Sequence, residues 1–341
     1  MLSRFKSAAR ILLKGDSKKK KRHPIPAITM EDVAEIKQFF PREKFFIFGH
    51  ARSGTTLLMR LLRLHPEVHC NYQGHFFTRQ PLLKSLVDTP EAEEWLARKS
   101  NRWNRGRDLS PLVLRAAADF IMERDAAKQG KRIVGDKSPS STIHGQAVRD
   151  MYSLYPDAKL IYIVRDGRDV LVSERFRNLV EESRFLKAED KQIVEGLRED
   201  PGQFTNGTRS IFTESVIRRV STGWVKNVQE IGDEGRRLFG KNYYSLKYED
   251  VLDRPFEEMQ RLWNFLGVQA AQSLEDSIIN EMVSNPDEEW QSKRNEDIAS
   301  FLSKGQAGNW QRLFTARDKS IFKEDAGEML IKWNYEKDLN W

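Results

Sequence analysis

The chain has 341 residues, of which 57 are Lys or Arg, 50 are Asp or Glu and one is Cys. A formal net charge of +7 is the kind of value that suggests a nucleic-acid or membrane partner. A single cysteine excludes an intramolecular disulfide and a zinc site built from several cysteines. No apolar run approaches the ~20 residues of a membrane span.

The positive charge is concentrated in the first residues. Residues 1–23 contain nine Lys or Arg and one Asp, so their net charge is +8, which leaves −1 for residues 24–341. We therefore expect residues 1–28 to form a basic, mobile tail and residues 29–341 to form one domain with no nucleic-acid partner. Peripheral contact of residues 1–23 with an anionic membrane surface is an alternative, because apolar residues recur there at helical intervals. A transit peptide is another, although the Lys cluster fits it poorly.

The tail also bears on localisation. Its apolar segment, Ile11–Leu13, is too short for a secretory signal, which favours a cytoplasmic protein. Association with a membrane surface through the tail is compatible with that location.

In chain order, a first helix is predicted from about Met30 to Phe40, with Thr29 as its N-cap and Pro41 ending it. A buried strand, a turn with two glycines and a helix with leucines at helical spacing follow over residues 44–63. Further strands are predicted at 132–135, 159–164 and 243–246. Further helices are predicted near 111–127, 143–155, 168–182, 210–231 and 256–266.

Strands that alternate with helices are typical of a parallel sheet covered on both faces. We therefore predict an α/β fold, a single three-layer domain with a central parallel sheet flanked by helices and a P-loop-like phosphate-binding turn. Residues 183–209 and 284–307 are polar, charged and contain Gly or Pro, so we expect excursions or mobile loops there.

The turn over residues 49–56 has the two glycines and terminal Thr of a Walker A loop, but Thr55 stands where the nucleotide-binding lysine belongs. The backbone N–H groups of residues 52–57 are expected to point at an anion at the helix N-terminus. Without that lysine and an evident Mg²⁺-binding Asp, the loop is expected to hold a phosphate that is not transferred. An ordinary strand–helix turn is the alternative.

A second phosphate site is suggested after the strand at 159–164. Arg165 follows the carboxyl end of that strand, Ser173 lies eight residues later, and Arg177 lies one helical turn beyond. The alternative is a salt-bridged helix start, in which acidic residues 166 and 169 pair with the arginines.

A third segment, near the C-terminus, combines Lys304 and Gly305 with Trp310 and Phe314. A Lys–Gly step in a polar loop can wrap a phosphate, while the aromatic residues dock the loop onto the domain. Taken alone, this segment favours the alternative of a loop that is merely anchored by aromatic residues.

Together these segments resemble the PAPS-dependent sulfotransferases, where PAPS is 3′-phosphoadenosine 5′-phosphosulfate. In that family the first loop binds the 5′-phosphosulfate, which assigns this role here to Arg52, Ser53, Gly54, Thr55, Thr56 and Leu57. The Arg…Ser pair at spacing eight binds the 3′-phosphate, here Arg165 and Ser173. The terminal pattern matches from Lys304 through Thr315, with Ser303 in place of the family's arginine.

Other positions are similar to the tyrosylprotein and carbohydrate branches. By this resemblance Arg177 is an additional phosphate-binding arginine, Tyr248 an adenosine-site tyrosine and Lys137 a catalytic lysine. Residues 65–70 follow the loop helix as they do in the tyrosylprotein enzymes. The order of the motifs covers roughly residues 44–336.

The resemblance implies in-line transfer of a sulfuryl group from PAPS to a hydroxyl or amine, with adenosine 3′,5′-bisphosphate as product and no metal. Arg52 is the candidate leaving-group clamp, and Lys137 is expected to contact the sulfuryl group unless it forms an ordinary ion pair with Asp136. The acceptor is left open among carbohydrate, lipid, small-molecule and peptide hydroxyls.

The general base is the least determined role. The tyrosylprotein enzymes have a glutamate just after the position of Cys70, and this sequence lacks it. His75 is the candidate because imidazole titrates near neutral pH. His50 and Asp136 are the alternatives.

Two other functional classes are kept open. A P-loop small-molecule kinase or nucleotide-binding protein would share the first loop but needs ATP, Mg²⁺ and the missing lysine. A non-enzymatic anion- or membrane-binding protein would explain the tail but not the ordered motifs.

Overall fold

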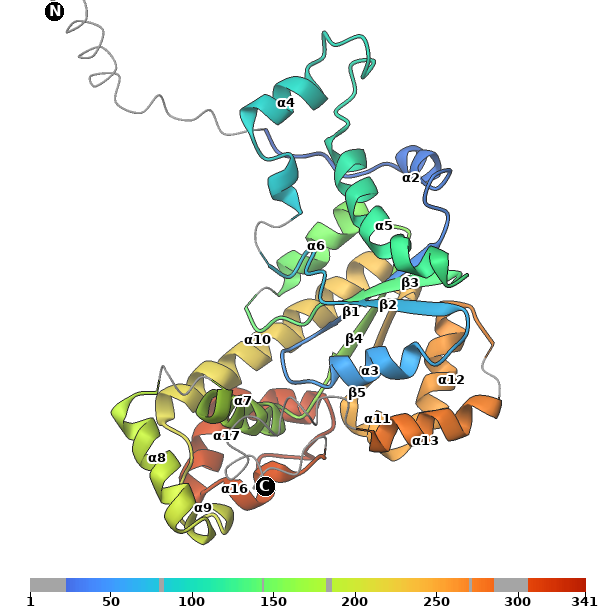
Figure 1. The fold of residues 1–341 in the computed structure, drawn as a ribbon. Helices are drawn as coiled ribbons and strands as arrows, with labels where there is room; N and C mark the ends of the chain where they lie inside the picture. The colour runs from blue at the N-terminus through green and yellow to red at the C-terminus, as the bar shows by residue number, and fades with distance from the viewer. Residues whose placement is uncertain (1–22, 80–82, 143, 182–185, 270–271, 285–305) are drawn as a thin grey trace, which may run out of the picture.

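The computed structural model describes residues 23–79, 83–142, 144–181, 186–269, 272–284 and 306–341. Its centre is a five-stranded sheet with the order β2-β3-β1-β4-β5, in which every neighbouring pair is parallel (Figure 1). The strands are β1 (Glu43–Gly49), β2 (Val68–Tyr72), β3 (Ile133–Lys137), β4 (Lys159–Val164) and β5 (Tyr243–Lys247). The predicted parallel α/β sheet is confirmed.

The helices connect these strands and cover both faces of the sheet. The helices of six or more residues are α2 (Met30–Ile36), α3 (Thr55–Leu62), α4 (Pro90–Ala97), α5 (Ser110–Lys128), α6 (Gly145–Leu154), α7 (Gly167–Glu181), α8 (Ala188–Glu199), α10 (Glu214–Phe239), α11 (Tyr248–Asp253), α12 (Pro255–Leu266), α13 (Glu275–Val283) and α17 (Ala316–Lys332). The short ones are α9 (Gly202–Thr205), α16 (Asn309–Leu313) and the 3-10 turns at Lys84–Leu86, Gly240–Asn242 and Gln272–Leu274.

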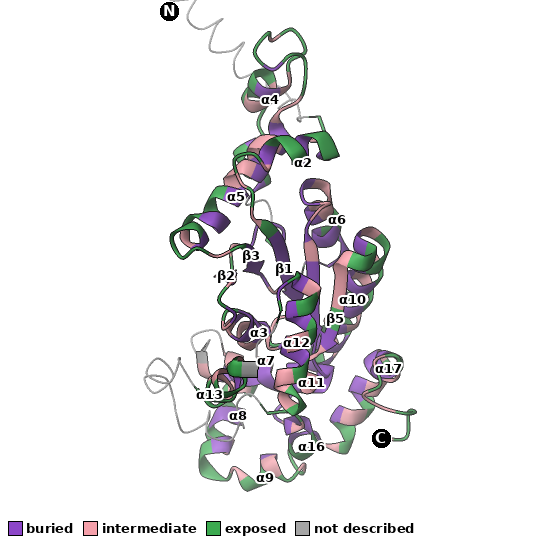
Figure 2. Ribbon diagram, turned by 90° about the vertical axis from the view of Figure 1, so that its right-hand side faces the viewer, coloured by how far each residue is buried: buried purple, intermediate pink, exposed green. Residues whose placement is uncertain are grey.

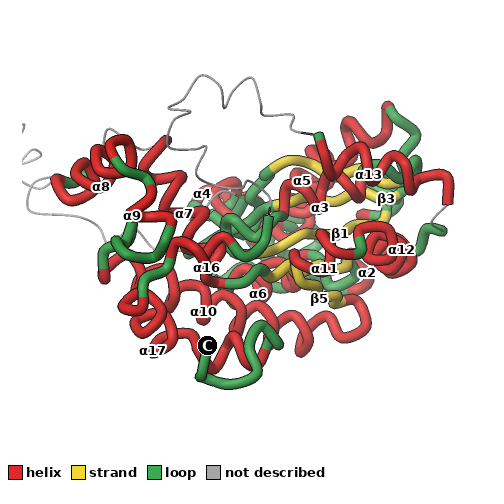
Figure 3. Tube along the Cα trace, turned by 90° about the horizontal axis from the view of Figure 1, so that it is seen from below, coloured by secondary structure: helices red, strands yellow, loops and turns green. Residues whose placement is uncertain are grey.

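Alternation along β1 produces two separate cores. Phe46 and Phe48 pack into a cluster with α5, α6, α7, α10 and α17, whereas Phe45 and Ile47 pack into another with α3, α12 and α13. Seen from below, the strands lie between α3 and α13 on one side and α10 and α17 on the other (Figure 3). The three inner strands, β3, β1 and β4, are almost entirely buried, whereas the edge strands β2 and β5 are buried only in part (Figure 2). This is the predicted three-layer arrangement.

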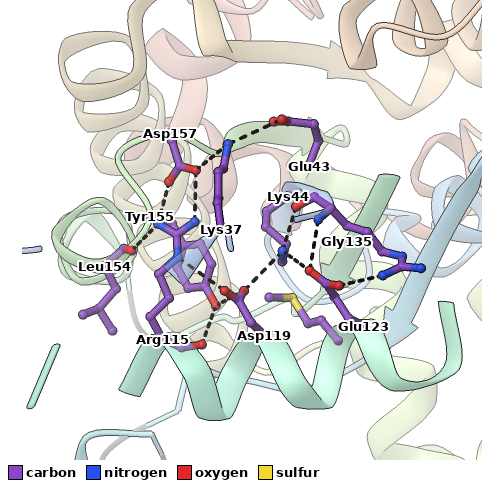
Figure 4. A network of polar contacts seen from close by, with 12 residues as sticks. Lys37, Glu43, Lys44, Arg115, Asp119, Glu123, Gly135, Leu154, Tyr155 and Asp157 are labelled. Atoms are coloured by element: carbon purple, nitrogen blue, oxygen red, sulfur yellow. Dashed lines mark hydrogen bonds and ion pairs between the residues drawn. The ribbon is translucent and has the colours of Figure 1, made fainter. Parts of the chain in front are cut away.

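A buried charge network fastens α5 to the amino end of β1 (Figure 4). The Lys44 ammonium lies 2.7 Å from the carboxylate of Glu123 and 3.5 Å from that of Asp119. Asp119 also accepts a hydrogen bond from the Tyr155 hydroxyl at 2.9 Å, and Arg115 pairs with Asp157 at 2.6 Å. Each buried charge therefore has an opposite charge within reach, as burial requires.

Three sequence-based expectations need correction. The first helix ends at Ile36 rather than Phe40. Residues 183–209 are not merely loop, because α8 and α9 form there; Ile193, Val194 and Leu197 are buried on one face of α8. Strand β2 was not predicted at all, because its polar residues obscure the pattern of an edge strand.

Two expected features lie outside the described residues. They are residues 1–22 of the tail expected over residues 1–28, and residues 285–305 of the loop expected over residues 284–307. In the part of the chain that is described, no helix is both long and apolar enough to cross a membrane.

Candidate active site

The candidate residues meet at the carboxyl edge of the sheet, where parallel sheets bind ligands. Each of the five strands brings a residue or loop to this edge. Strand β1 leads into the glycine loop, β2 into the turn with His75, β3 ends at Lys137, β4 precedes Arg165, and β5 precedes Tyr248. Sequence positions almost 200 residues apart therefore lie in one site.

The glycine loop is shaped by Gly54 and covered by Tyr248. Gly54 has φ of +83°, the left-handed region that glycine tolerates. A Cβ atom there would lie 2.1 Å from Cδ2 of Tyr248, so the tyrosine ring rests directly on the loop backbone. This contact joins the end of β5 to the start of α3.

The N-terminus of α3 is open to an anion. No side chain caps it, and the first N–H groups of any helix lack intrahelical acceptors. The Ser53 hydroxyl beside it is fully buried and has no hydrogen-bond partner among the described residues. A phosphate oxygen would satisfy both kinds of group, so the loop suits a phosphate-bearing ligand.

Arg165 is held against the same loop. Its guanidinium donates to the carbonyl of Arg52 at 3.2 Å and to the carbonyl of Gln306 at 2.9 Å, while its buried Nε lacks a partner in the described chain. The Trp224 indole donates to the Arg165 carbonyl at 3.0 Å and fixes the backbone. The guanidinium also lies 4.8 Å from the ring centre of Tyr248.

Helix α7 presents the other two predicted residues of this group. The hydroxyl of Ser173, which is buried, accepts a hydrogen bond from Nε of Arg52 at 3.0 Å. Arg177 lies one turn further along the helix and is half-buried. These contacts bring Arg52, Arg165 and Ser173 together.

The salt-bridged helix start is also present, but it does not use Arg165. Asp166 pairs with Arg168 at 2.6 Å. Asp169 accepts hydrogen bonds from the backbone N–H groups of Gly308, at 2.7 Å, and Trp310, at 3.1 Å. Among the described residues Asp169 forms no ion pair with an arginine, although the charge of Arg165 acts on it, because its oxygens bind the backbone at the start of α16.

Lys137 is fully buried at the end of β3. Its ammonium donates to the Thr56 hydroxyl at 3.2 Å and lies 3.7 Å from the ring centre of Tyr72. Burial lowers the pKa of Lys137 to about 8, because removal from water disfavours the charged form. The ammonium thus faces the N-terminal turn of α3.

Asp136 does not neutralise Lys137 by an ion pair. Successive residues of a strand point to opposite faces, and the Asp136 carboxylate accepts hydrogen bonds from the Gly74 N–H, at 2.7 Å, and the Ser138 hydroxyl. Burial raises the pKa of Asp136 to about 6. Both carboxylate oxygens are engaged, which makes Asp136 a poor candidate for the base.

His75 is buried in the turn after β2, with φ of +50°. Its backbone N–H donates to Ser138 Oγ at 2.8 Å, its Nδ1 lies 2.8 Å from the Thr78 hydroxyl, and its Nε2 has no partner in the described chain. Desolvation, together with Arg79 and Lys137, lowers its pKa, so the imidazole is neutral at pH 7. A neutral ring with a free nitrogen can accept a proton.

The alternative base, His50, has a different setting. It is buried at the end of β1, and its Nδ1 lies 2.8 Å from the carbonyl oxygen of Ala51. Burial lowers its pKa, and the charged groups that act on it are Glu174 and Arg219. Lys137 is not among them.

The C-terminal segment is described only in part. Lys304 and Gly305 lie outside the described residues. Trp310 and Phe314 are buried, and their ring centres are 5.9 Å apart, so the predicted aromatic anchoring is confirmed.

Sequence reasoning missed several groups that shape the site. The Tyr72 ring beside Lys137 and the Thr78 hydroxyl beside His75 depend on a strand and a turn that carry no motif. The Gln306 carbonyl that holds Arg165 could not be found, because a backbone acceptor leaves no trace in the sequence.

Comparison with protein families places this geometry in context. A family model described as "Sulfotransferase family" matches residues 44–272, more than half of the chain. The chain is 26% identical over 227 residues to protein-tyrosine sulfotransferase A of Caenorhabditis elegans, covering 65% of this chain and 49% of that protein. It is 23% identical over 268 residues to chicken protein-tyrosine sulfotransferase 2, covering 76% and 60%. The chain thus spans about half the length of such curated relatives.

Solved structures give a more distant similarity. A mouse sulfotransferase, SULT7A1, complexed with PAP has 15% identity and a TM-score of 0.44, covering 87% of this chain and 89% of that one. A sulfotransferase from Alicyclobacillus acidocaldarius has 22% identity and a TM-score of 0.39, covering 80% and 99%.

Proposed function

Because the chain belongs to the sulfotransferase family, we propose that it transfers the sulfuryl group of PAPS to an acceptor hydroxyl or amine. The observation that carries the proposal is the convergence of an uncapped helix N-terminus, Arg165 and Tyr248 at one edge of the sheet. These groups offer hydrogen-bond donors, positive charge and an aromatic ring, which a nucleotide with several phosphates requires.

The donor would be held at two points. The loop residues Arg52, Ser53, Gly54, Thr55, Thr56 and Leu57 would hold the 5′-phosphosulfate. Arg165, Ser173 and Arg177 would hold the 3′-phosphate, with Lys304 and Gly305, and Tyr248 would contact the adenosine. The buried, unpartnered Ser53 hydroxyl and Arg165 Nε support this assignment, because a buried polar group without a partner is costly.

The transfer would rest on positioning and fixed charge, as in phosphoryl transfer. The acceptor oxygen or nitrogen forms a bond to sulfur while the bond from sulfur to the bridging oxygen breaks. Negative charge grows on the leaving bisphosphate and on the sulfuryl oxygens. Arg52 would stabilise the leaving group, and Lys137 the sulfuryl oxygens, so we propose that no metal is needed.

The acceptor must lose its proton during the attack. His75 would take it, because its Nε2 is free, its ring is neutral and Thr78 holds Nδ1. His75 is a better candidate for the general base than Asp136, because both Asp136 oxygens already accept hydrogen bonds.

The acceptor class and the location are further proposals. Relatives named protein-tyrosine sulfotransferases favour a peptide tyrosine as the first acceptor to try, ahead of carbohydrate, lipid and small-molecule hydroxyls. A net charge of −1 over residues 24–341 disfavours nucleic acid. We keep a cytoplasmic location as a proposal, to be checked by fractionation of the source cells.

The test is transfer of ³⁵S from labelled PAPS to acceptors of each class, in buffer containing a metal chelator. Arg165→Ala should lower kcat/KM for PAPS by about 100-fold, because it removes charge-assisted hydrogen bonds. Arg236→Ala, an exposed arginine on α10, is the matched control and should leave the rate unchanged. Equal rates for the two variants would contradict the proposal.

A further inference from the structure

A basic and aromatic surface lies on α4 and the residues that follow it, away from the candidate active site. We call residues 90–107 the α4 surface. Trp95 and Trp103 are 62% and 53% exposed, and their ring centres lie 5.8 Å apart. Figures 1 and 2 both show α4 at one extremity of the molecule. Two large aromatic rings that are exposed side by side form an apolar patch, and such patches mark binding surfaces.

The α4 surface carries a net charge of +2, with Glu91, Glu93 and Glu94 in its first residues and all of its cations after Trp95. Residues 95–107 include five Lys or Arg and no Asp or Glu. Lys99, Arg102 and Arg105 are exposed and make no ion pair with any residue that the structure describes. Arg98 and Arg107 do pair, with Glu94 and with Asp32 and Glu35. Three cations are therefore available to an external partner.

The surface is held in shape by hydrogen bonds from two asparagine side chains to backbone carbonyls. Asn104 is buried, and its side-chain amide donates to the carbonyls of Leu96, at 3.1 Å, and Arg98, at 3.3 Å. The Asn101 amide donates to the carbonyl of Trp95 at 3.1 Å. The tryptophans and cations are thus presented on an ordered scaffold, which lowers the entropy cost of binding.

The basic N-terminal segment enters the domain at the same place. The backbone N–H of His23 donates to the carboxylate of Glu93 in α4 at 3.2 Å, and the His23 ring also contacts that carboxylate. His23, the residue that follows the basic residues 1–22 in the sequence, therefore contacts α4.

We infer that the α4 surface binds an anionic membrane, with Trp95 and Trp103 at the lipid–water interface and Lys99, Arg102 and Arg105 at the lipid headgroups. Tryptophan favours that interface because its ring is apolar and its N–H is polar. Each cation near an anionic leaflet adds attraction. A soluble polyanion would use the cations but would not explain the exposed rings. This inference does not depend on the transfer reaction.

The test uses the full chain and vesicles of phosphatidylcholine with or without phosphatidylserine. Lys99→Gln/Arg102→Gln/Arg105→Gln should weaken binding to the phosphatidylserine vesicles by about tenfold or more. The matched control, Lys226→Gln/Arg236→Gln/Lys241→Gln at exposed positions of α10 and the turn after it, removes the same charge and should retain at least most of the binding.

The insertion of the rings is tested separately. Brominated phosphatidylcholine in the vesicles should quench part of the tryptophan fluorescence, and Trp95→Phe/Trp103→Phe should abolish that quenching. Ile279→Ala/Val283→Ala on α13, where both side chains are exposed, is the control and should keep it.

Three results would overturn the inference. One is vesicle binding that disappears on deletion of residues 1–22 but is unchanged in the lysine and arginine variant. Another is binding to heparin through these cations with no binding to vesicles, which would indicate a soluble polyanion. The third is quenching that survives the tryptophan substitutions.

Discussion

Lys137 is the residue whose surroundings predict the plainest change with pH. Its ammonium must be protonated to stabilise the sulfuryl oxygens, and burial lowers its pKa to about 8. We expect kcat/KM for PAPS to fall as the pH rises through about 8. Lys137→Arg keeps the charge because guanidinium stays protonated, so its alkaline limb should move upward even where the rate is reduced. An alkaline limb at the same pH in both proteins would contradict the role of Lys137.

The lowered pKa of Lys137 also makes folding stability depend on pH. The unfolded lysine holds its proton up to about pH 10.4, whereas the folded one loses it near 8. Between these values the unfolded state binds more protons, so the contribution of Lys137 to folding stability increases with pH. Below pH 8 the buried ammonium is charged, and its desolvation destabilises the folded state. The proposed reaction needs that charge.

His75 determines the acidic limb of the expected pH–activity profile. Its neutral form is the base, and its pKa lies below its usual value, so activity should fall only at acidic pH. His75→Ala should lower kcat by roughly 100-fold, within the range for loss of a general base, while leaving binding of adenosine 3′,5′-bisphosphate intact. Turnover near that of the unaltered protein across the whole pH range would remove His75 from the mechanism.

Single site residues could be predicted from the sequence where they belong to a recognisable motif. Arg52, Arg165 and Ser173 follow glycine-containing or strand-ending patterns, and the structure brings them together. The partners that hold them were not predictable, because Gln306 contributes a backbone carbonyl and Trp224 reaches Arg165 from a helix far along the chain.

Among the elements, the loop between β1 and α3 is the most demanding in its geometry. Gly54→Ala would place a methyl group in a left-handed backbone position and against the Tyr248 ring. We expect affinity for adenosine 3′,5′-bisphosphate to fall by about tenfold or more, as measured by calorimetry. Gly223→Ala on α10 has open space around it and should bind normally. Unchanged affinity in Gly54→Ala would contradict the loop geometry.

The network between α5 and β1 gives a prediction for stability. Asp119→Ala leaves Lys44 and Arg115 with one carboxylate partner each and removes the acceptor of the Tyr155 hydroxyl. We expect the free energy of unfolding to drop by about 3 kcal/mol in urea titration, because the change breaks a buried ion pair. Asp125→Ala, whose carboxylate is exposed on the same helix, should leave the free energy of unfolding nearly unchanged. Equal effects would contradict the role of the buried network.

Elements were predictable in proportion to their apolar pattern. Strands β1 and β4 are continuous apolar runs in the centre of the sheet, and their predicted positions match closely. Strand β2 is a short edge strand with polar residues, and α8 buries only one narrow apolar face, so neither produced a clear signal.

For the whole molecule, the overall charge proved a poor guide to the partner. The candidate site uses a few cations at one edge of the sheet, whereas the excess of positive over negative charge lies in residues 1–23, whose net charge is +8. The fold class followed from the alternation of strands and helices, because that pattern depends on the chain as a whole. The relation of α4 to the N-terminal segment did not, because it depends on tertiary contacts such as that between His23 and Glu93.

The central claim is that the carboxyl edge of the sheet holds a 3′-phosphorylated adenine nucleotide. It is tested most directly by thermal unfolding of the full chain with adenosine 3′,5′-bisphosphate and, separately, with ATP and Mg²⁺. The account predicts that saturating bisphosphate raises the Tm by about 2 °C or more with a chelator present, and that ATP with Mg²⁺ has little effect. Stabilisation by ATP with Mg²⁺ alone would contradict it and would favour a P-loop kinase.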